Sequence, residues 1–144
     1  MAATQTYSNH TRWNPLVHFV VTPLLLLNFL SHVVRLFMEP SWAMAFWTLL
    51  SFTLILMSVA ARLQALTAQD RLIRLEEKLR YREVLSPALA DRFNELRTSQ
   101  VIALRFASDA ELGGLVERTL KGEFAKPNEI KKAIKDWRGD HLRV

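Results

Sequence analysis

The sequence contains no cysteine, which excludes disulfides, thiol nucleophiles, iron–sulfur clusters and thiolate zinc sites. Glycine is scarce, with four residues in 144, and Gly113-Gly114 lacks the spacing of a phosphate-binding loop. The four histidines are scattered without the spacing of a metal site, and no arrangement of nucleophile and base is evident. We therefore expect no enzyme activity, no metal site and no small-molecule substrate.

Charge is absent from two long apolar runs near the start of the chain. Trp13–Val34 and Ser41–Ala61 contain no Lys, Arg, Asp or Glu. Each is long enough to cross a hydrocarbon core of roughly 30 Å, which needs about 20 helical residues. Backbone polar groups in lipid must bond within the protein, so such runs must be helical. Residues 13–61 are therefore predicted to form a transmembrane helical hairpin, with spans at about 15–37 and 41–62.

A cleaved signal peptide is the alternative interpretation of the first run, and Ala43-Met44-Ala45 resembles a cleavage site. The apolar stretch, however, exceeds the usual core of about 7–15 residues, and only Arg12 precedes it as a basic residue. A second full-length run follows at once. We therefore interpret both runs as membrane spans.

Charge around the spans predicts their orientation. Six basic residues follow the second span: Arg62, Arg71, Arg74, Lys78, Arg80 and Arg82. The connection between the spans carries one charge of each sign, Arg35 and Glu39. The positive-inside rule then places both termini in the cytoplasm. Trp13 and Trp42 fall at opposite interfaces, where indole rings prefer to lie, and are expected to contact the membrane surface.

Local signals mark the ends of both spans. Asn14 and Pro15 suit a helix start, with Asn14 as the cap. Pro23 removes a backbone donor within the first span and frees the carbonyl of Phe19, which predicts a kink. Ser41 is placed to cap the second helix.

The second span predicts a helix that continues far beyond the membrane. No Gly or Pro occurs from Ser41 through Ser86, so residues 62–85 are expected to form a cytoplasmic stalk. Asp70–Arg74 and Glu76–Arg80 have the spacing of favourable helical ion pairs. Two apolar stripes indicate contacts on more than one side: Val59, Leu63, Leu66 and Ile73, and separately Leu72, Leu75 and Leu79. The repeat is too short to predict a free-standing coiled coil.

Residues 1–12 read as a polar cytoplasmic arm, and residues 86–144 as a small cytoplasmic helical domain. Four short helices are expected in that domain: Pro87–Leu96, Ser99–Phe106, Ser108 to about Lys121, and Pro127–Trp137. Ser108 and Glu111 have the spacing of a capping box. Four short helices are marginal alone, so we expect them to lean on the stalk, the lipid surface or another subunit.

Polar groups in the spans are candidates for binding or contact. His18 and His32 lie in the first span, and an imidazole there can ligate the metal of a tetrapyrrole pigment or haem. The alternative is structural hydrogen bonding to the second helix or to another chain. Small hydroxyl residues recur along one face of the second span, at Thr48, Ser51 and Ser58. Together with Asn28 of the first span, they are the expected helix–helix contact residues. These hydroxyls alternatively bond back to their own helix.

The last expected helix is basic and amphipathic. Its cations are Lys131, Lys132, Lys135 and Arg138, and its apolar side chains are Ile130, Ile134 and Trp137. Such a helix suits docking on an anionic membrane surface, and an ordinary solvated face is the alternative. No nucleic-acid recognition module accompanies the net charge of +5, so nucleic acid is not an expected partner.

Four stretches carry a resemblance to a known family: Thr4–Phe19, Asp70–Glu77, Val101–Asp109 and Ile130–Arg138. The chain resembles an uncharacterised family, labelled only as a domain of unknown function, of small two-span bacterial inner-membrane proteins. The resemblance implies this topology and a bacterial inner-membrane setting. It implies no activity and no catalytic residue.

Together these patterns predict an all-α membrane protein made of a transmembrane hairpin, a stalk and a small helical domain. The preferred hypothesis is a non-enzymatic inner-membrane subunit that anchors protein–protein association, with itself or with other membrane subunits. The alternative is a pigment- or haem-binding accessory subunit of an electron-transfer or light-harvesting complex, with His18 or His32 as the ligand. A third hypothesis is a regulator that switches its basic last helix on and off the bilayer.

Overall fold

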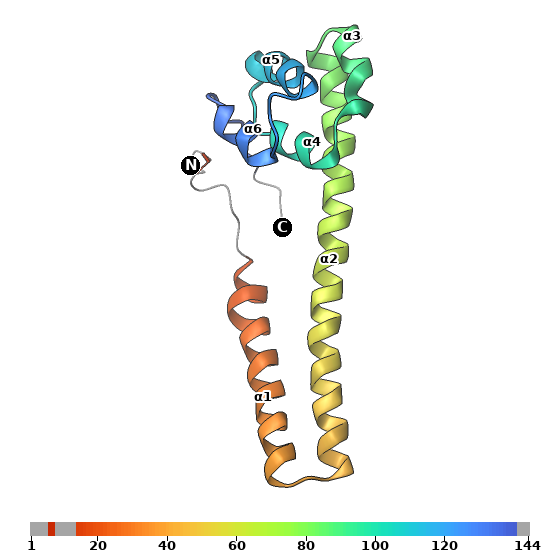
Figure 1. The fold of residues 1–144 in the computed structure, drawn as a ribbon, viewed down its shortest axis with the longest axis vertical. Helices are drawn as coiled ribbons and strands as arrows, with labels where there is room; N and C mark the ends of the chain where they lie inside the picture. The colour runs from red at the N-terminus through yellow and green to blue at the C-terminus, as the bar shows by residue number, and fades with distance from the viewer. Residues whose placement is uncertain (1–5, 8–13, 141–144) are drawn as a thin grey trace. The chain divides into compact units, whose positions relative to one another are not determined.

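The computed structural model describes residues 6–7 and 14–140, and it divides into two compact units (Figure 1). One unit is Trp13–Leu66, and the other is Thr67–Arg143 together with Met1–Arg12. Trp13 and most of the expected arm lie outside the described residues. Among the described residues every regular element is helical, apart from one isolated antiparallel bridge between Ala107 and Trp137, so the all-α fold is confirmed. The elements are the π-helix η1 (Leu16–Val21), α1 (Thr22–Met38), α2 (Trp42–Val84), α3 (Pro87–Ala90), the 3-10 helix η2 (Asp91–Glu95), α4 (Thr98–Leu104), α5 (Asp109–Leu120) and α6 (Pro127–Ala133).

The first helix begins where the sequence predicts. The Asn14 side-chain oxygen accepts a hydrogen bond from the Val17 N–H at 3.3 Å, which satisfies one of the unpaired donors at a helix start. The π-helix η1 lies just before Pro23, and the kink expected at Pro23 stays a prediction. The carbonyl of Val17 accepts from both the N–H and the hydroxyl of Thr22, the latter at 2.8 Å. The threonine hydroxyl thus adds a hydrogen bond next to Pro23, which has no backbone N–H to donate.

The turn between α1 and α2 is short. Glu39 leaves the helical conformation (φ −137°, ψ 73°), as expected for a residue that precedes proline. The Ser41 hydroxyl oxygen accepts from the Met44 N–H at 3.2 Å, so the expected cap is confirmed. The helix α2 then runs without interruption to Val84, which confirms the long continuous helix. The segments Leu16–Met38 and Trp42–Val84 are both long and apolar enough to cross a membrane.

The second unit has a compact apolar core. Its largest fully buried side chains are Tyr81, Val101, Leu104, Phe106, Leu112, Val116 and Ile130. Tyr81 comes from α2 and meets the edge of Phe93 with ring centroids 5.1 Å apart. Ile73, also on α2, is 6% exposed. The short helices therefore use one side of α2 as part of their core, as expected for a domain too small to close on itself.

Two of the predicted short helices differ in form. The predicted helix Pro87–Leu96 is divided into α3 and the 3-10 helix η2. The Ser108 side chain makes no cap hydrogen bond at the start of α5, so the predicted capping box is wrong. Glu111 instead accepts hydrogen bonds from the backbone N–H groups of Lys135 and Asp136, each at 3.2 Å.

The predicted extent of the last helix is also wrong. The helix α6 ends at Ala133, and Ile134 is extended (φ −70°, ψ 124°). The chain after it pairs with the segment that follows α4, because the Arg138 N–H donates to the Phe106 carbonyl at 2.8 Å. The rings of Phe106 and Trp137 pack 5.1 Å apart. These tertiary contacts override the helical spacing of the sequence.

The substitution Leu112→Ala tests the core of the second unit. Leu112 is fully buried, at 0% exposure, and we expect its truncation to lower the free energy of unfolding by about 2–5 kcal/mol. Pulse proteolysis in urea, with the full chain in mild detergent, measures the change. Glu117→Ala, an exposed position on the same helix, is the matched control. Equal urea midpoints for the two variants would contradict this account of the core.

Candidate functional site

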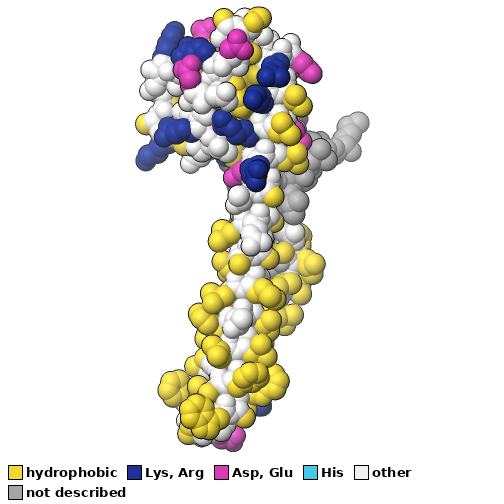
Figure 2. Space-filling model, turned by 90° about the vertical axis from the view of Figure 1, so that its right-hand side faces the viewer, with side chains coloured by type: hydrophobic (Ala, Val, Ile, Leu, Met, Phe, Trp, Pro, Cys, Tyr) yellow, Lys and Arg dark blue, Asp and Glu magenta, His cyan; other side chains and the backbone are white. Residues whose placement is uncertain are grey.

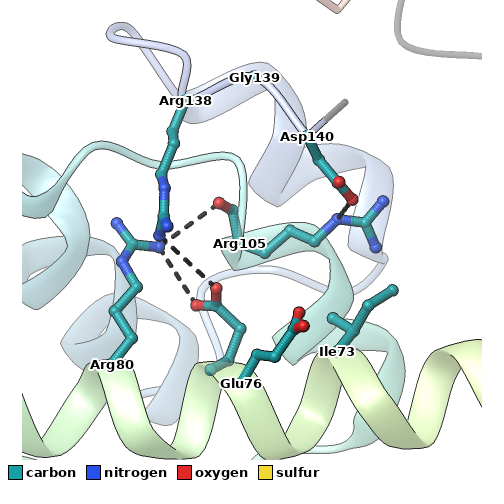
Figure 3. A pocket seen from close by; sticks show the side chains of 8 residues that line it. Ile73, Glu76, Arg80, Arg105, Arg138, Gly139 and Asp140 are labelled. Atoms are coloured by element: carbon teal, nitrogen blue, oxygen red, sulfur yellow. Dashed lines mark hydrogen bonds and ion pairs between the residues drawn. The ribbon is translucent and has the colours of Figure 1, made fainter. Parts of the chain in front are cut away.

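A cavity of about 420 Å³ in the second unit is lined by eight residues: Ile73, Glu76, Glu77, Arg80, Arg105, Arg138, Gly139 and Asp140 (Figure 3). The first four lie on α2, Arg105 follows α4, and the last three lie after α6. Three chain segments that are distant in sequence therefore meet at one cluster of arginines and carboxylates.

Arg80 is the most extensively bonded side chain of this cluster. Its Nε and Nη2 atoms donate to one carboxylate oxygen of Asp109 at 2.8 and 2.6 Å. Nη1 lies 3.2 Å from a Glu77 oxygen, and Nη2 donates to the Ala107 carbonyl at 2.7 Å. The Arg80 side chain is 9% exposed. The rigid fork of one guanidinium thus joins α2 to the start of α5.

Arg105 and Arg138 complete the cluster from the other two segments (Figure 3). The Arg105 guanidinium pairs with Asp140 at 3.0 Å and lies over the Phe106 ring, 4.4 Å from its centroid. The Arg105 carbonyl also accepts from Arg80 at 3.4 Å. Arg138 reaches within 3.9 Å of Glu77. The chain that follows α6 is therefore held to α2 and to the end of α4 by charged contacts.

Glu77 is a carboxyl group buried among these arginines. Its removal from water raises its pKa above the ordinary value, and the guanidinium groups of Arg80 and Arg138 offset part of that rise. Burial also raises the pKa of Tyr81, one helical turn further along α2. The cavity lining holds three arginines and three carboxylates, a balance that favours neither an anionic nor a cationic ligand. The arrangement suits the fixing of segments to one another better than ligand capture or proton transfer.

The sequence interpretation missed this cluster. It paired Arg80 with Glu76, whereas the structure pairs Arg80 with Glu77 and Asp109. It likewise paired Arg74 with Asp70, whereas Arg74 donates to the Leu96 carbonyl at 3.1 Å. One signal was present, because Arg105 interrupts the apolar stretch Val101–Ala107. An arginine within a buried stretch needs a partner.

In the first unit, three of the four expected helix–helix contact residues hydrogen-bond to the facing helix: Asn28, Thr48 and Ser51. Asn28 donates to the Ser51 hydroxyl at 3.1 Å, and the Thr48 hydroxyl lies 3.3 Å from the His32 carbonyl. Thr48 and Ser51 also donate to carbonyls of their own helix, at 2.8 and 2.7 Å. Ser58 lines a small cavity together with Thr22 and His18. Contact with the facing helix and bonding within the helix therefore occur together.

The two histidine candidates of the first apolar helix are not brought together. The His18 ring nitrogen Nδ1 lies 2.9 Å from the Asn14 carbonyl, and the His32 ring stacks on Trp47 with centroids 6.4 Å apart. Fourteen helical residues correspond to roughly 21 Å. One copy of the chain therefore does not place both imidazoles on one metal, and tetrapyrrole binding stays a prediction.

The candidate membrane-surface residues occupy different settings. Trp42 is 94% exposed at the start of α2. Lys131 lies over the Phe106 ring at 5.6 Å, and Lys132 over the Tyr7 ring at 5.8 Å. Lys135 and Arg138 follow the end of α6, so the four cations do not share one helix face.

The apolar side chains of the expected amphipathic helix are also committed elsewhere. Ile130 and Ile134 are 0% and 6% exposed within the core of the second unit. A membrane-docking helix needs an apolar face that is free to enter the lipid. The predicted length of the helix over Pro127–Trp137 is therefore wrong, and its apolar side chains pack in the core of the second unit.

A family model described as a family of unknown function (DUF6526) matches residues 1–144. No curated protein and no solved structure matches the chain.

The substitution Arg80→Met tests the structural role of the cluster. It leaves Glu77 buried without its closest cation, and breaking a buried pair in this way costs about 3–5 kcal/mol of unfolding free energy. Urea unfolding of the full chain in detergent measures the loss. Arg92→Met, which breaks the exposed pair with Glu95, is the control and is expected to change little. The double variant Arg80→Met with Glu77→Met should lose less stability than Arg80→Met alone, because no carboxylate is then left buried beside a missing cation. A loss as large as that of the single variant would contradict the pairing with Glu77.

The buried carboxyl of Glu77 also predicts a pH dependence. Because its folded pKa is raised from 4.5, the folded chain binds this proton more tightly than the unfolded chain does. The contribution of Glu77 to stability therefore falls as pH rises from the unfolded pKa through the folded one. Urea midpoints measured from about pH 4 to 8 should fall more steeply for the native chain than for Glu77→Gln. Parallel curves for the two proteins would contradict the burial of this charge.

Proposed function

The chain belongs to a family of unknown function, DUF6526, and from this premise we propose that it is a non-enzymatic integral membrane subunit. In this proposal Trp13–Ala61 forms a transmembrane hairpin, and the remainder of the chain serves protein–protein association. The resemblance to small bacterial membrane proteins extends the proposal to the bacterial inner membrane.

The exposure of the apolar helices carries this proposal. No side chain in the apolar window of Leu16–Met38 is buried within the chain, and only 6% of the window in Trp42–Val84 is. Phe37 and Trp42, beside the turn, are 84% and 94% exposed. Figure 2 shows many apolar side chains on the face of this unit that it presents. An apolar surface of this extent needs lipid or another protein to cover it, whereas the core helix of a soluble protein is covered by its own chain.

Hydrogen bonding within the first unit supports the same proposal. The Asn28 amide and the Ser51 hydroxyl bond to each other at 3.1 Å, and Ser51 is only 3% exposed. Such polar pairing between helices is typical of membrane spans, because a polar side chain facing lipid has no other partner. Most of the other exposed side chains of this unit are apolar.

Charge distribution supports the orientation. The described basic residues of the second unit all follow the two apolar runs in the sequence, beyond Arg62. The turn between α1 and α2 holds Glu39 next to Pro40 and only Arg35 as a nearby cation. The proposal therefore places the turn outside the cell and the second unit in the cytoplasm.

The absence of cysteine allows a direct topology test with single introduced thiols. Glu39→Cys marks the turn and Glu117→Cys marks α5, and both native side chains are exposed. In intact cells a membrane-impermeant maleimide should label the Glu39→Cys variant, and should label Glu117→Cys only after the membrane is permeabilised. Both variants should stay in the membrane after an alkaline carbonate wash. Labelling of both in intact cells, or release by carbonate, would overturn the proposal.

A further inference from the structure

The helix α2 has a second apolar face that the rest of its unit does not cover. Ala68, Leu72, Leu75 and Leu79 are exposed and separated by four, three and four residues, the spacing of a coiled-coil seam. Leu72, Leu75 and Leu79 are 56%, 56% and 54% exposed. We name these four residues the α2 leucine stripe. The same spacing continues toward the start of the helix at Ala65 and Ala61, which are also exposed.

The remainder of the second unit covers the other side of α2. Ile73, Glu77, Arg80 and Tyr81 are all less than a tenth exposed. At 100° per residue, their mean direction lies roughly 160° around the helix from the α2 leucine stripe. The core and the Arg80 cluster therefore hold the short helices on the side of α2 opposite the stripe. Another helix can lie along the stripe without displacing them.

Charged side chains flank the stripe with a definite pattern. Arg71 and Lys78 lie on one side of it, and they directly precede Leu72 and Leu79 in the sequence. Glu76 and Glu83 lie on the other side. In a parallel, in-register pair of helices, a residue at the position of Arg71 or Lys78 faces the residue five positions later on the other helix. Arg71 then meets Glu76 of a second copy, and Lys78 meets Glu83 of a second copy.

The same charges disfavour an antiparallel pair. Antiparallel alignment brings the row of Arg71 and Lys78 beside the corresponding row of the second helix, so cation faces cation. It also brings Glu76 and Glu83 beside carboxylates. Like charges across such a seam are destabilising. The flanking charges thus match a second copy of this same helix, aligned in parallel.

We propose that two copies of the chain associate along the α2 leucine stripe as a parallel, in-register, two-stranded coiled coil. This inference rests on the proposed function, because anchoring in one membrane gives all copies the same direction and so makes parallel alignment the natural one. Anchoring also raises the local concentration of the copies, which lets a seam of few heptads associate. The occupant of the stripe is a second copy of this chain.

Disulfide trapping in native membranes tests the proposal, because the chain has no other thiol. Leu75→Cys places a thiol in the seam, where two copies bring their side chains together. Thr67→Cys is the matched control, since Thr67 is exposed on the same helix but points roughly 110° away from the stripe. Mild oxidation should convert most of Leu75→Cys into a covalent dimer and leave Thr67→Cys monomeric. Equal yields from the two variants would overturn the proposal.

Charge reversal tests the alignment without altering the leucines. In the Leu75→Cys background, Lys78→Glu and Glu83→Lys each place like charges across the seam, so each should lower the dimer yield. Chains carrying the two reversals, produced together with different tags, regain opposite charges in the mixed pair. The mixed dimer should exceed either self-pair by roughly threefold or more, as exposed pairs of this kind allow. A statistical mixture of the three dimers would overturn the parallel register.

The outcomes separate this inference from the proposed function. If Leu75→Cys resists extraction by carbonate but stays monomeric on oxidation, the second-copy proposal fails and the membrane subunit stands. If the chain is released by carbonate, the membrane proposal fails whatever the yield of dimer. A mass of three or more chains for the unoxidised protein in mild detergent would overturn the two-stranded arrangement.

Discussion

The buried guanidinium of Arg80 decides which side of α2 the short helices cover. Its bonds to Asp109 and to the Ala107 carbonyl join α2 to the start of α5, and its bond to Glu77 lies within α2, at distances between 2.6 and 3.2 Å. Tyr81, one residue later, carries the apolar core onto the same side. A pair of this kind is costly to break once it is out of water. It therefore fixes orientation more than it adds net stability.

That orientation separates α2 into two working faces. One face belongs to the core of the second unit, and the other presents the α2 leucine stripe with its rows of opposite charge. The membrane proposal and the second-copy proposal use different parts of the chain, because lipid covers the apolar helices and a second copy covers the stripe. No active-site geometry is needed for either role, and the charge-balanced cavity beside Arg80 is consistent with a structural purpose.

Much of the fold follows from the sequence alone. The continuous helix α2 is predictable because good helix formers run from Ser41 to Ser86 without Gly or Pro. The caps at Asn14 and Ser41 are predictable because their bonds are local. The end of α6 is not, since it depends on pairing with Phe106, which is distant in sequence. The partners of Arg80 are hidden for the same reason, as Asp109 is 29 residues away. Local spacing allows several helix ends and several ion-pair partners, and contacts between residues distant in sequence determine which of them form.

The two faces of α2 can be measured directly in a lipid bilayer. Single nitroxide labels placed in turn from residue 67 to residue 83 report the mobility of each side chain by electron paramagnetic resonance. We expect strong immobilisation with helical periodicity on the side of Ile73, Glu77 and Tyr81, and the Arg80→Met substitution should release it. Uniform mobility along the segment, or immobilisation that ignores Arg80, would contradict the claim that this arginine holds the short helices to α2.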